Sequence, residues 1–268
     1  MPMPEDLYLV RHGESEGNLV NRRSRAGDDS LFTPEHVNRH SSQWHLTDRG
    51  IQQAQAAGEF LRREAKLPFE VHLTSEWVRA METAAYLGIP DAQWHPYVYL
   101  RERSLGELET LPHKEKVERF GASLDLRKRY PYLWRAEQGE AFEDISLKWD
   151  RIQQILHRKY AMQRALVVSH EGVLWEARHL IERLLIRDMD RLLSSDDPAD
   201  RIHNCQIIHY TRRDPVTGQL SAHLDWVRSV CPWDLSLSSN EWRRVVRRTY
   251  SNEELLEMAA EYPRLYAE

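Results

Sequence analysis

The chain has 268 residues, of which 29% are charged and 41% are hydrophobic, and its formal net charge at pH 7 is −5. A chain of this length can bury a core without disulfide or metal staples, and this composition is not that of a disordered protein. The acidic excess argues against a nucleic-acid partner, because nucleic-acid binders usually carry a basic excess. The sequence offers no apolar run of about 18 residues that could span a membrane.

The N-terminus and the cysteines both bear on where the protein is located in the cell. Residues 1–6 are acidic and lack the apolar segment of a secretory signal. Cys205 and Cys231 form no disulfide or metal-binding pattern, which favours a reducing compartment. We therefore expect a cytoplasmic globular protein, either an enzyme or a binding module.

Short apolar strands alternate with helical patterns along the chain. Strands are predicted at residues 7–10, 71–74, 98–100, 165–168, 204–210 and 220–227, and helices at 48–65, 76–87, 142–160 and 172–186. Residues 19–45 show little periodicity and are expected to form a long polar loop, whereas the tail from about residue 235 is helical in composition.

This alternation predicts the fold class, which is α/β. We expect a three-layer sandwich with a mainly parallel central sheet, helices on both faces and a helical cap inserted at about residues 106–140. Residues 1–268 would form a single catalytic domain, with a C-terminal extension over about 235–268.

Polar residues follow four of the predicted strands, at the edge where ligands of such sheets bind. They are Arg11 and His12, Ser75 with Arg79, Arg101 and Glu102, and Ser169 and His170. No HExxH and no paired cysteines accompany them, so we expect no metal and no cofactor. Guanidinium groups match phosphate oxygens in bidentate fashion, and the set therefore predicts an anion site.

The same residues suit phosphoryl transfer. Nearby arginines should lower the pKa of His12, and a neutral imidazole can attack phosphorus. Glu102 could supply the leaving-group proton if its pKa is raised. Phosphoryl transfer depends mainly on positioning the reacting groups and on neutralising the negative charge of the phosphoryl group.

Five segments in order resemble motifs of the histidine phosphatase superfamily, the phosphoglycerate-mutase-like proteins. They are residues 9–18, 46–50, 74–84, 101–106 and 168–172, and the resemblance covers about residues 7–210. It implies that His12 becomes phosphorylated and that Glu102 donates the proton and later helps water to attack. It also implies that the phosphoryl group is bound by Arg11, Arg79 and His170, with help from Asn18.

Two departures from the family pattern bear on function. Glu171 follows His170, where its carboxylate would repel an anion if it pointed inward, and residues 104–106 lack the HYG string of the mutase branch. We therefore predict a metal-independent phosphomonoester hydrolase that acts through phospho-His12. Its partner would be a phosphorylated small molecule or phosphoprotein substrate, and the late strands and tail could form a homodimer face.

Three alternatives stay open, namely a phosphoglycerate-type mutase, a phospho-ligand binder without turnover and a serine esterase. The esterase would use Ser15, which lies in a GxSxG pattern at residues 13–17. Only one strand precedes Ser15, whereas that motif needs an oxyanion loop from an earlier strand.

Specificity is expected in residues 19–45 and 106–140. Basic residues of the first segment could form a substrate lip or simply a solvated loop; they are Arg22, Arg23, Arg25, His36, Arg39, His40 and His45. Trp134 could line the substrate pocket or pack inside the cap.

Overall fold

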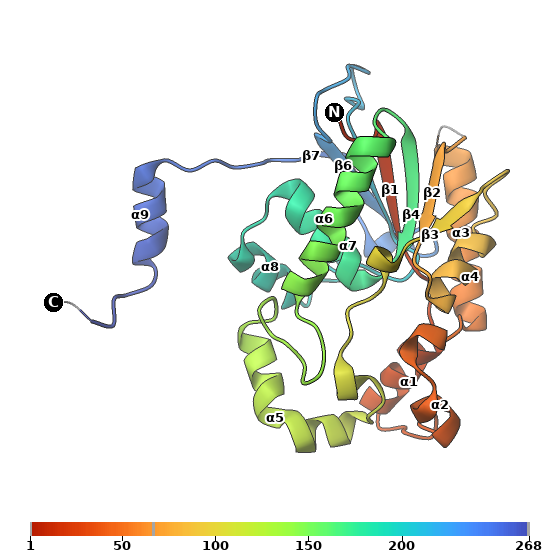
Figure 1. Cartoon of the computed structure of the whole chain (residues 1–268), viewed down its shortest axis with the longest axis vertical. Helices are drawn as coiled ribbons and strands as arrows, with labels where there is room; N and C mark the ends of the chain where they lie inside the picture. The colour runs from red at the N-terminus through yellow and green to blue at the C-terminus, as the bar shows by residue number, and fades with distance from the viewer. Residues whose placement is uncertain (1, 66–67, 267–268) are drawn as a thin grey trace.

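A seven-stranded sheet forms the centre of this computed structural model, which describes residues 2–65 and 68–266 (Figure 1). Its strand order is β3-β2-β4-β1-β5-β6-β7. The strands are β1 Asp6–Arg11, β2 Val71–Thr74, β3 Trp94–Pro96, β4 Arg164–Ser169, β5 Ile207–Thr211, β6 Trp226–Val230 and β7 Arg243–Arg244.

The sheet is parallel in one half and antiparallel in the other. Strand β4 pairs in parallel with β1 and β2, and β2 with β3. Strands β5, β6 and β7 each run antiparallel to the preceding neighbour in the sheet. The carboxyl ends of β1, β2 and β4 therefore meet at one edge, as the sequence predicts.

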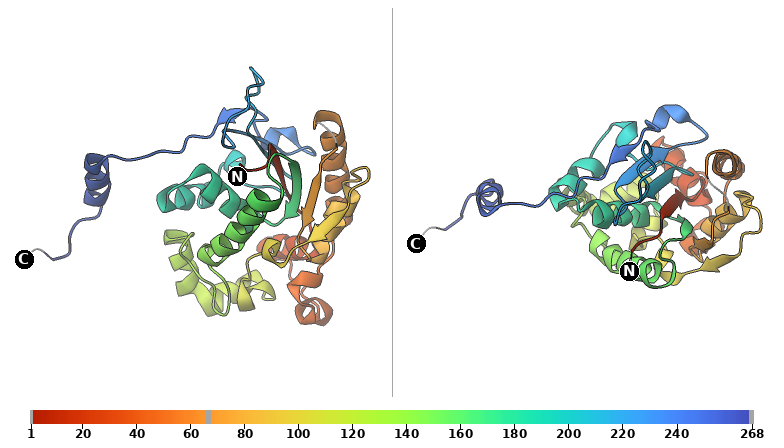
Figure 2. Two further views of the ribbon diagram at one scale, coloured as in Figure 1. Left: turned by 45° about the horizontal axis from the view of Figure 1, so that its top comes forward. Right: turned by 90° about the horizontal axis from the view of Figure 1, so that it is seen from above.

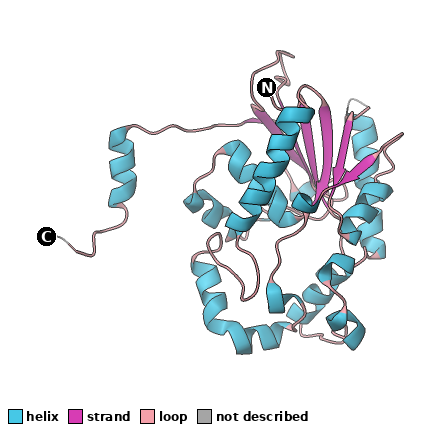
Figure 3. Ribbon diagram, viewed as in Figure 1, coloured by secondary structure: helices cyan, strands magenta, loops and turns pink. Residues whose placement is uncertain are grey.

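Helices cover both faces of the sheet (Figure 3). Helices α3 and α4 pack on one face, and α6 and α7 on the other. The α-helices of the described residues are α1 Glu16–Arg25, α2 Pro34–Asn38, α3 Asp48–Glu64, α4 Val78–Tyr86, α5 His113–Arg129, α6 Phe142–Lys159, α7 Glu171–Glu182, α8 Ile186–Leu193 and α9 Asn252–Ala260.

Alternating side chains of β1 enter two separate hydrophobic cores. Leu7 and Leu9 pack with α6 and α7, whereas Tyr8 and Val10 pack with α3 and α4 on the opposite face. This alternation is the period of two expected of a strand buried on both sides. The predicted three-layer α/β architecture is confirmed; the sheet, predicted as mainly parallel, is mixed, with parallel pairing from β3 to β1 and antiparallel pairing from β1 to β7.

Several element boundaries differ from the prediction. Residues 19–45, predicted as a loop, contain most of α1, all of α2 and a 3-10 turn at Ser41–Gln43. The two helices escape a periodicity search because α1 buries few side chains and α2 buries none. The N-cap residues Ser15 and Thr33 were the signals in the sequence that could have indicated where these two helices begin.

The third strand is also displaced along the chain. Strand β3 lies at residues 94–96, and Val98–Leu100, predicted as a strand, is a 3-10 turn. Helix α7 ends at Glu182 rather than 186, because Arg183 takes a left-handed conformation with φ 53°. The last strand predicted at 220–227 is β6 at 226–230.

The predicted insertion forms a helical cap. It holds a 3-10 turn, Gly106–Glu109, and α5, which is kinked at Phe120. Trp134 packs in a small cluster of its own with Leu108 and Ala136, so it belongs to the interior of the cap. Its indole Nε1 donates to Ser123 Oγ at 3.0 Å.

The tail is helical only in part. Residues 243–244 form β7 against β6, and α9 is the α-helix of this region among the described residues. Figure 2 shows α9 standing away from the body on an extended segment, in both views. In the described parts of the chain, no helix combines the length and apolarity needed to cross a membrane.

Candidate active site

His12 lies directly after β1 and is buried. Its Nδ1 is 2.7 Å from the carbonyl oxygen of Gly13, and this short contact requires that Nδ1 carry the proton and donate. The lone pair of the imidazole is then on Nε2. The backbone therefore selects the tautomer in which Nε2 can act as a nucleophile.

Arg79, in the first turn of α4, lies against that nitrogen. Its Nε donates to His12 Nε2 at 3.2 Å, and its Nη1 donates to the carbonyl of Ser41 at 2.7 Å. The guanidinium also lies 4.6 Å from the ring centroid of Trp77. A buried, doubly oriented guanidinium beside a nucleophile is well placed to bind a phosphoryl oxygen.

Arg11 supplies a second cation at the end of β1. Its Nη1 donates to the carbonyl of Ile202 at 2.5 Å, and its Nη2 forms an ion pair with Glu171 at 2.9 Å. Glu171 thus binds Arg11 and neutralises part of its charge. The nitrogen Nε of Arg11 is buried without a hydrogen-bond partner among the described residues.

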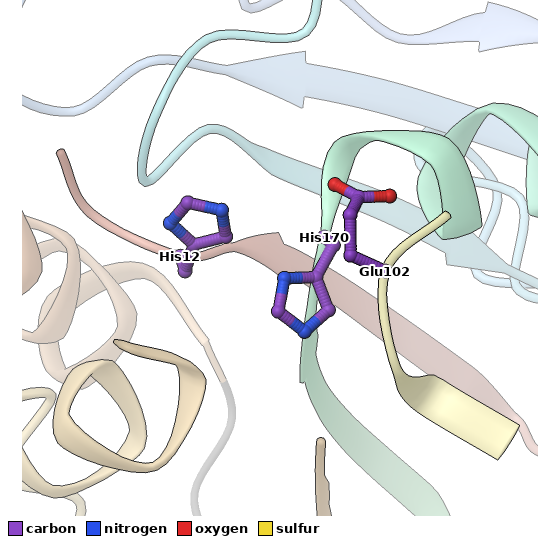
Figure 4. A group of neighbouring side chains, drawn as sticks. All are labelled: His12, Glu102 and His170. Atoms are coloured by element: carbon purple, nitrogen blue, oxygen red, sulfur yellow. The ribbon is translucent and has the colours of Figure 1, made fainter. Parts of the chain in front are cut away.

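His170 faces His12 from the end of β4, and the two ring centroids are 5.1 Å apart (Figure 4). Its Nε2 is 2.9 Å from the hydroxyl of Ser75, the residue that follows β2. The other ring nitrogen, Nδ1, is buried and has no partner within the described chain. Ser75 therefore orients His170, a role that the sequence interpretation did not assign.

Glu102 reaches the two histidines from the segment after the 3-10 turn at 98–100 (Figure 4). Ser169 Oγ donates to the carbonyl of Leu100 at 2.7 Å and holds this segment at the end of β4. Glu102 Oε1 accepts hydrogen bonds from the backbone N–H groups of Arg103 and Gly172, at 2.9 and 3.1 Å. A Cβ on Gly172 would lie 2.7 Å from that oxygen, so only glycine fits there without displacing the carboxylate.

Burial shifts the pKa values of these groups in opposite directions. It lowers the pKa of His12 well below its ordinary value, and the charges of Arg79 and Arg11 lower it further. The pKa of His170 falls for the same reasons. Burial raises the pKa of Glu102. Burial therefore favours the neutral form of both His12 and Glu102.

Asn18 has a capping role in the structure. Its Oδ1 accepts from the backbone N–H and the hydroxyl of Ser15, each at 3.1 Å, at the start of α1. Asn204 links it to the nucleophile, donating from Nδ2 to Asn18 Oδ1 at 3.3 Å and to the carbonyl of His12 at 3.0 Å. Asn204 is 192 residues from His12 in sequence, and no local pattern could have identified it.

Ser15 does not resemble an esterase nucleophile. Its hydroxyl is buried at the N-terminus of α1, where it donates to Asn18 Oδ1 and accepts from Asn18 N–H at 3.4 Å. The GxSxG pattern therefore encodes a helix cap. The ionisable side chains that lie around His12 are Arg79, Glu102 and His170.

His12, Glu102 and His170 also meet the distance requirement for a metal site, since one ligand atom of each lies within 4.8 Å of the others. The surroundings oppose a cation. Arg79 already donates to His12 Nε2, the atom a metal would need, and Arg11 adds a second positive charge. The donor set therefore suits an anion better than a metal ion.

Comparison with known proteins identifies the family. The model of the histidine phosphatase superfamily (branch 1) matches residues 7–212, which is more than half of the chain. The chain belongs to the histidine phosphatase superfamily. The matched region contains every residue of the site described above.

Several curated relatives carry names that join a kinase and a bisphosphatase. The chicken 6-phosphofructo-2-kinase/fructose-2,6-bisphosphatase is 32% identical over 171 residues, which is 64% of this chain and 31% of the relative. The mouse protein 6-phosphofructo-2-kinase/fructose-2,6-bisphosphatase 1 is 31% identical over 189 residues, 70% of this chain and 34% of the relative. The chain thus spans about a third of the length of these relatives.

Solved structures share the fold. The α-ribazole phosphatase of Shigella flexneri has a TM-score of 0.59 at 21% identity, covering 81% of this chain and 95% of its own. A mycobacterial glucosyl-3-phosphoglycerate phosphatase has a TM-score of 0.59 at 18% identity, covering 91% of this chain and 100% of its own. At sequence identities of 21% and 18%, the similarity shows a shared fold and does not bear on the substrate.

Proposed function

We propose that the chain is a metal-independent phosphomonoester hydrolase that forms a phosphohistidine on His12. The observation that carries the proposal is the hydrogen bond from His12 Nδ1 to Gly13, which leaves Nε2 unprotonated beside Arg79 and near Glu102. Family membership and the names of the relatives agree with this activity. We propose His12, Glu102 and His170 as catalytic residues and Arg11, Arg79 and Asn18 as the phosphate-binding set.

In the first step, His12 Nε2 attacks phosphorus and the ester P–O bond breaks. Glu102 gives its proton to the leaving oxygen, for which its raised pKa prepares it. Arg79 exchanges its hydrogen bond with Nε2 for one with a phosphoryl oxygen, and Arg11 and His170 hold the remaining negative charge. The Nδ1–H bond to Gly13 persists and stabilises the positive charge of the phosphorylated ring.

In the second step, the ionised Glu102 takes a proton from water as that water attacks the phosphohistidine. The P–N bond breaks, inorganic phosphate leaves and His12 returns to its starting tautomer. A phosphoglycerate-type mutase would use the same site but return the phosphoryl group to substrate. A serine esterase lacks support, because Ser15 caps α1.

The wider predictions remain part of this proposal. We propose that residues 1–268 form one catalytic domain, that the substrate is a phosphorylated small molecule or phosphoprotein, and that the protein works in the cytoplasm. A homodimer through the late strands and the tail also stays a prediction. Because sequence relatives are named as fructose-2,6-bisphosphatases, sugar phosphates belong among the first substrates to try.

Phosphate release from p-nitrophenyl phosphate and a panel of phosphomonoesters, measured with EDTA present, tests the proposal. We expect turnover in EDTA, its loss in His12→Ala, and an acid-labile, base-stable phosphoenzyme after rapid quenching. Full activity in His12→Ala would contradict the mechanism. Isomerisation of a phosphoglycerate without net phosphate release would support the mutase instead.

A further inference from the structure

The segment after β6 returns to the end of the sheet where His12 lies. Strand β5 runs antiparallel to both β1 and β6, so β6 points the same way as β1 and ends at the same edge. Trp233 comes three residues after the end of β6. The region matched by the family model ends at residue 212, so this segment lies beyond it. Trp233 is therefore a candidate for a contribution to the site that the family match does not cover.

Trp233 binds the peptide group that joins Asn204 to Cys205. Its indole Nε1 donates to the carbonyl oxygen of Asn204 at 2.6 Å. The N–H of the same peptide belongs to Cys205, and it donates to the carbonyl oxygens of Arg11 at 3.0 Å and His12 at 3.3 Å. This peptide group thus lies between the indole and the end of β1. Hydrogen bonds linked in such a chain polarise and strengthen one another.

The side chain of Asn204 adds a second hydrogen bond to the same carbonyl. Its Nδ2 donates to the carbonyl oxygen of His12 at 3.0 Å. The N–H of Gly13, on the other side of that peptide group, donates to Thr83 Oγ1 at 3.0 Å. The peptide group between His12 and Gly13 is therefore held at both its oxygen and its nitrogen.

The orientation of this peptide group bears on the tautomer of the nucleophile. His12 Nδ1 is 2.7 Å from the carbonyl oxygen of Gly13, and this contact keeps the ring proton on Nδ1. A rotation of the peptide group between the two residues would displace Gly13 and lengthen the contact. The ring would then also populate the form protonated on Nε2, which cannot attack phosphorus.

The conformation of Cys205 explains why the turn needs outside support. Cys205 is buried and takes a left-handed conformation with φ 53°, which is unfavourable for residues other than glycine. Such a conformation persists only where surrounding contacts fix it. The ring of Trp233 is itself fixed, because it packs against the core on the α3 side and lies 5.3 Å from the guanidinium of Arg49. Trp233 is thus a well-oriented donor to a strained turn.

We propose that Trp233 is a positioning residue for His12 and acts through the peptide group of Asn204 and Cys205. The indole N–H holds that peptide group against the end of β1, and the two donors of the turn then fix the backbone beside the nucleophile. This inference rests on the proposed function and deepens it. It gives the chain beyond residue 212 a part in the site, and that part concerns the attacking group rather than the proton donor.

Trp233→Phe tests the inference, because it removes the indole N–H and keeps an aromatic ring. We expect the rate of phosphoenzyme formation, followed by rapid quenching, to fall by about three- to tenfold, the size of one hydrogen bond. The loss should be equal for p-nitrophenyl phosphate and alkyl phosphates, because the attacking group is displaced and the acid is not. Asn204→Ala removes a donor to the same carbonyl and should give the same pattern.

Trp242→Phe is the matched control. Trp242 lies in the same late part of the chain but packs against His209, with ring centroids 4.9 Å apart, and against Arg228 at 5.0 Å. It should leave the rate unchanged. A rate in Trp233→Phe equal to that of the wild type, a loss confined to alkyl phosphates, or an equal loss in Trp242→Phe would overturn the inference.

A separate measurement distinguishes failure of this inference from failure of the proposed function. If the wild type forms no phosphoenzyme, the proposed function fails, and NMR of the ring nitrogens of His12 tests the positioning role alone. We expect the proton on Nδ1 in the wild type and a mixture of the two tautomers in Trp233→Phe. The same tautomer population in both proteins would refute the role of Trp233.

Discussion

Replacing Gly172 by alanine tests whether Glu102 acts as the proton donor. The added Cβ would lie 2.7 Å from Glu102 Oε1, about 0.7 Å inside ordinary van der Waals contact, so the carboxylate must move by that amount. The hydrogen bond from Gly172 N–H to Oε1, now 3.1 Å, would be lost or lengthened. A displacement near 1 Å can slow a reaction by about 100-fold, and general-acid catalysis as a whole contributes about 100- to 10,000-fold.

The loss should depend on the leaving group. We expect kcat/KM to fall by about 10- to 100-fold for alkyl phosphates, which need the proton, and by less than about threefold for p-nitrophenyl phosphate. Steady-state kinetics on both ester types measures this difference, with Glu102→Gln as the reference for complete loss of the acid. Equal slowing of both ester types, or no slowing of either, would refute the assignment.

Stability provides the control for this substitution. Gly172 is in the first turn of α7, where alanine is a better helix former than glycine by up to about 1 kcal/mol. The group that must move is the end of a flexible side chain, so folding should be largely unaffected. The melting temperature is therefore expected to stay equal or rise while activity on alkyl esters falls. A large fall in melting temperature would show that the backbone had moved instead.

Three further predictions concern neighbouring groups. Ser75→Ala removes the 2.9 Å partner of His170 Nε2 and should lower kcat by about tenfold, and Ser75→Thr should restore part of it if the hydroxyl orients the ring. Glu171→Gln frees Arg11 from its 2.9 Å ion pair, so inorganic phosphate should inhibit several-fold more tightly at low salt, and an unchanged inhibition constant would contradict this. Because the raised pKa of Glu102 keeps the acid protonated only below that pKa, kcat/KM for alkyl esters should fall as pH rises through it, and a descent of the same shape in Glu102→Gln would assign it to another group.

Much of the fold and of the site could be predicted because parallel strands constrain position strongly. Once β1, β2 and β4 are recognised as buried strands, their carboxyl ends must lie at one edge. The residues immediately after them, including His12, Ser75 and His170, must then lie close together. No loop conformation has to be known to place these residues.

The remaining contacts depend on segments with little local pattern. Glu102 was expected directly after a strand, but it follows a 3-10 turn instead. A hydrogen bond from Ser169 to Leu100 holds this turn at the end of β4, so Glu102 still lies at the predicted edge of the sheet. Asn204 reaches His12 across 192 residues, and Ser41 orients Arg79 from a stretch without apolar periodicity. Such partners are fixed by tertiary packing, which the spacing of hydrophobic residues does not encode.

The two ionisable partners of the proposed reaction owe their states to one physical cause. Burial disfavours the charged form of any group, so it lowers the pKa of His12 and raises that of Glu102. A neutral base and a neutral acid can then coexist at one pH, although the same residues in water would both be charged near pH 5 to 6. In the proposed reaction, positive charge for the phosphoryl group comes instead from Arg79, which remains charged and is oriented by the carbonyl of Ser41. His12 and Arg79 are both buried and in contact, so the proposed reaction has an uncharged base and a charged phosphate ligand side by side.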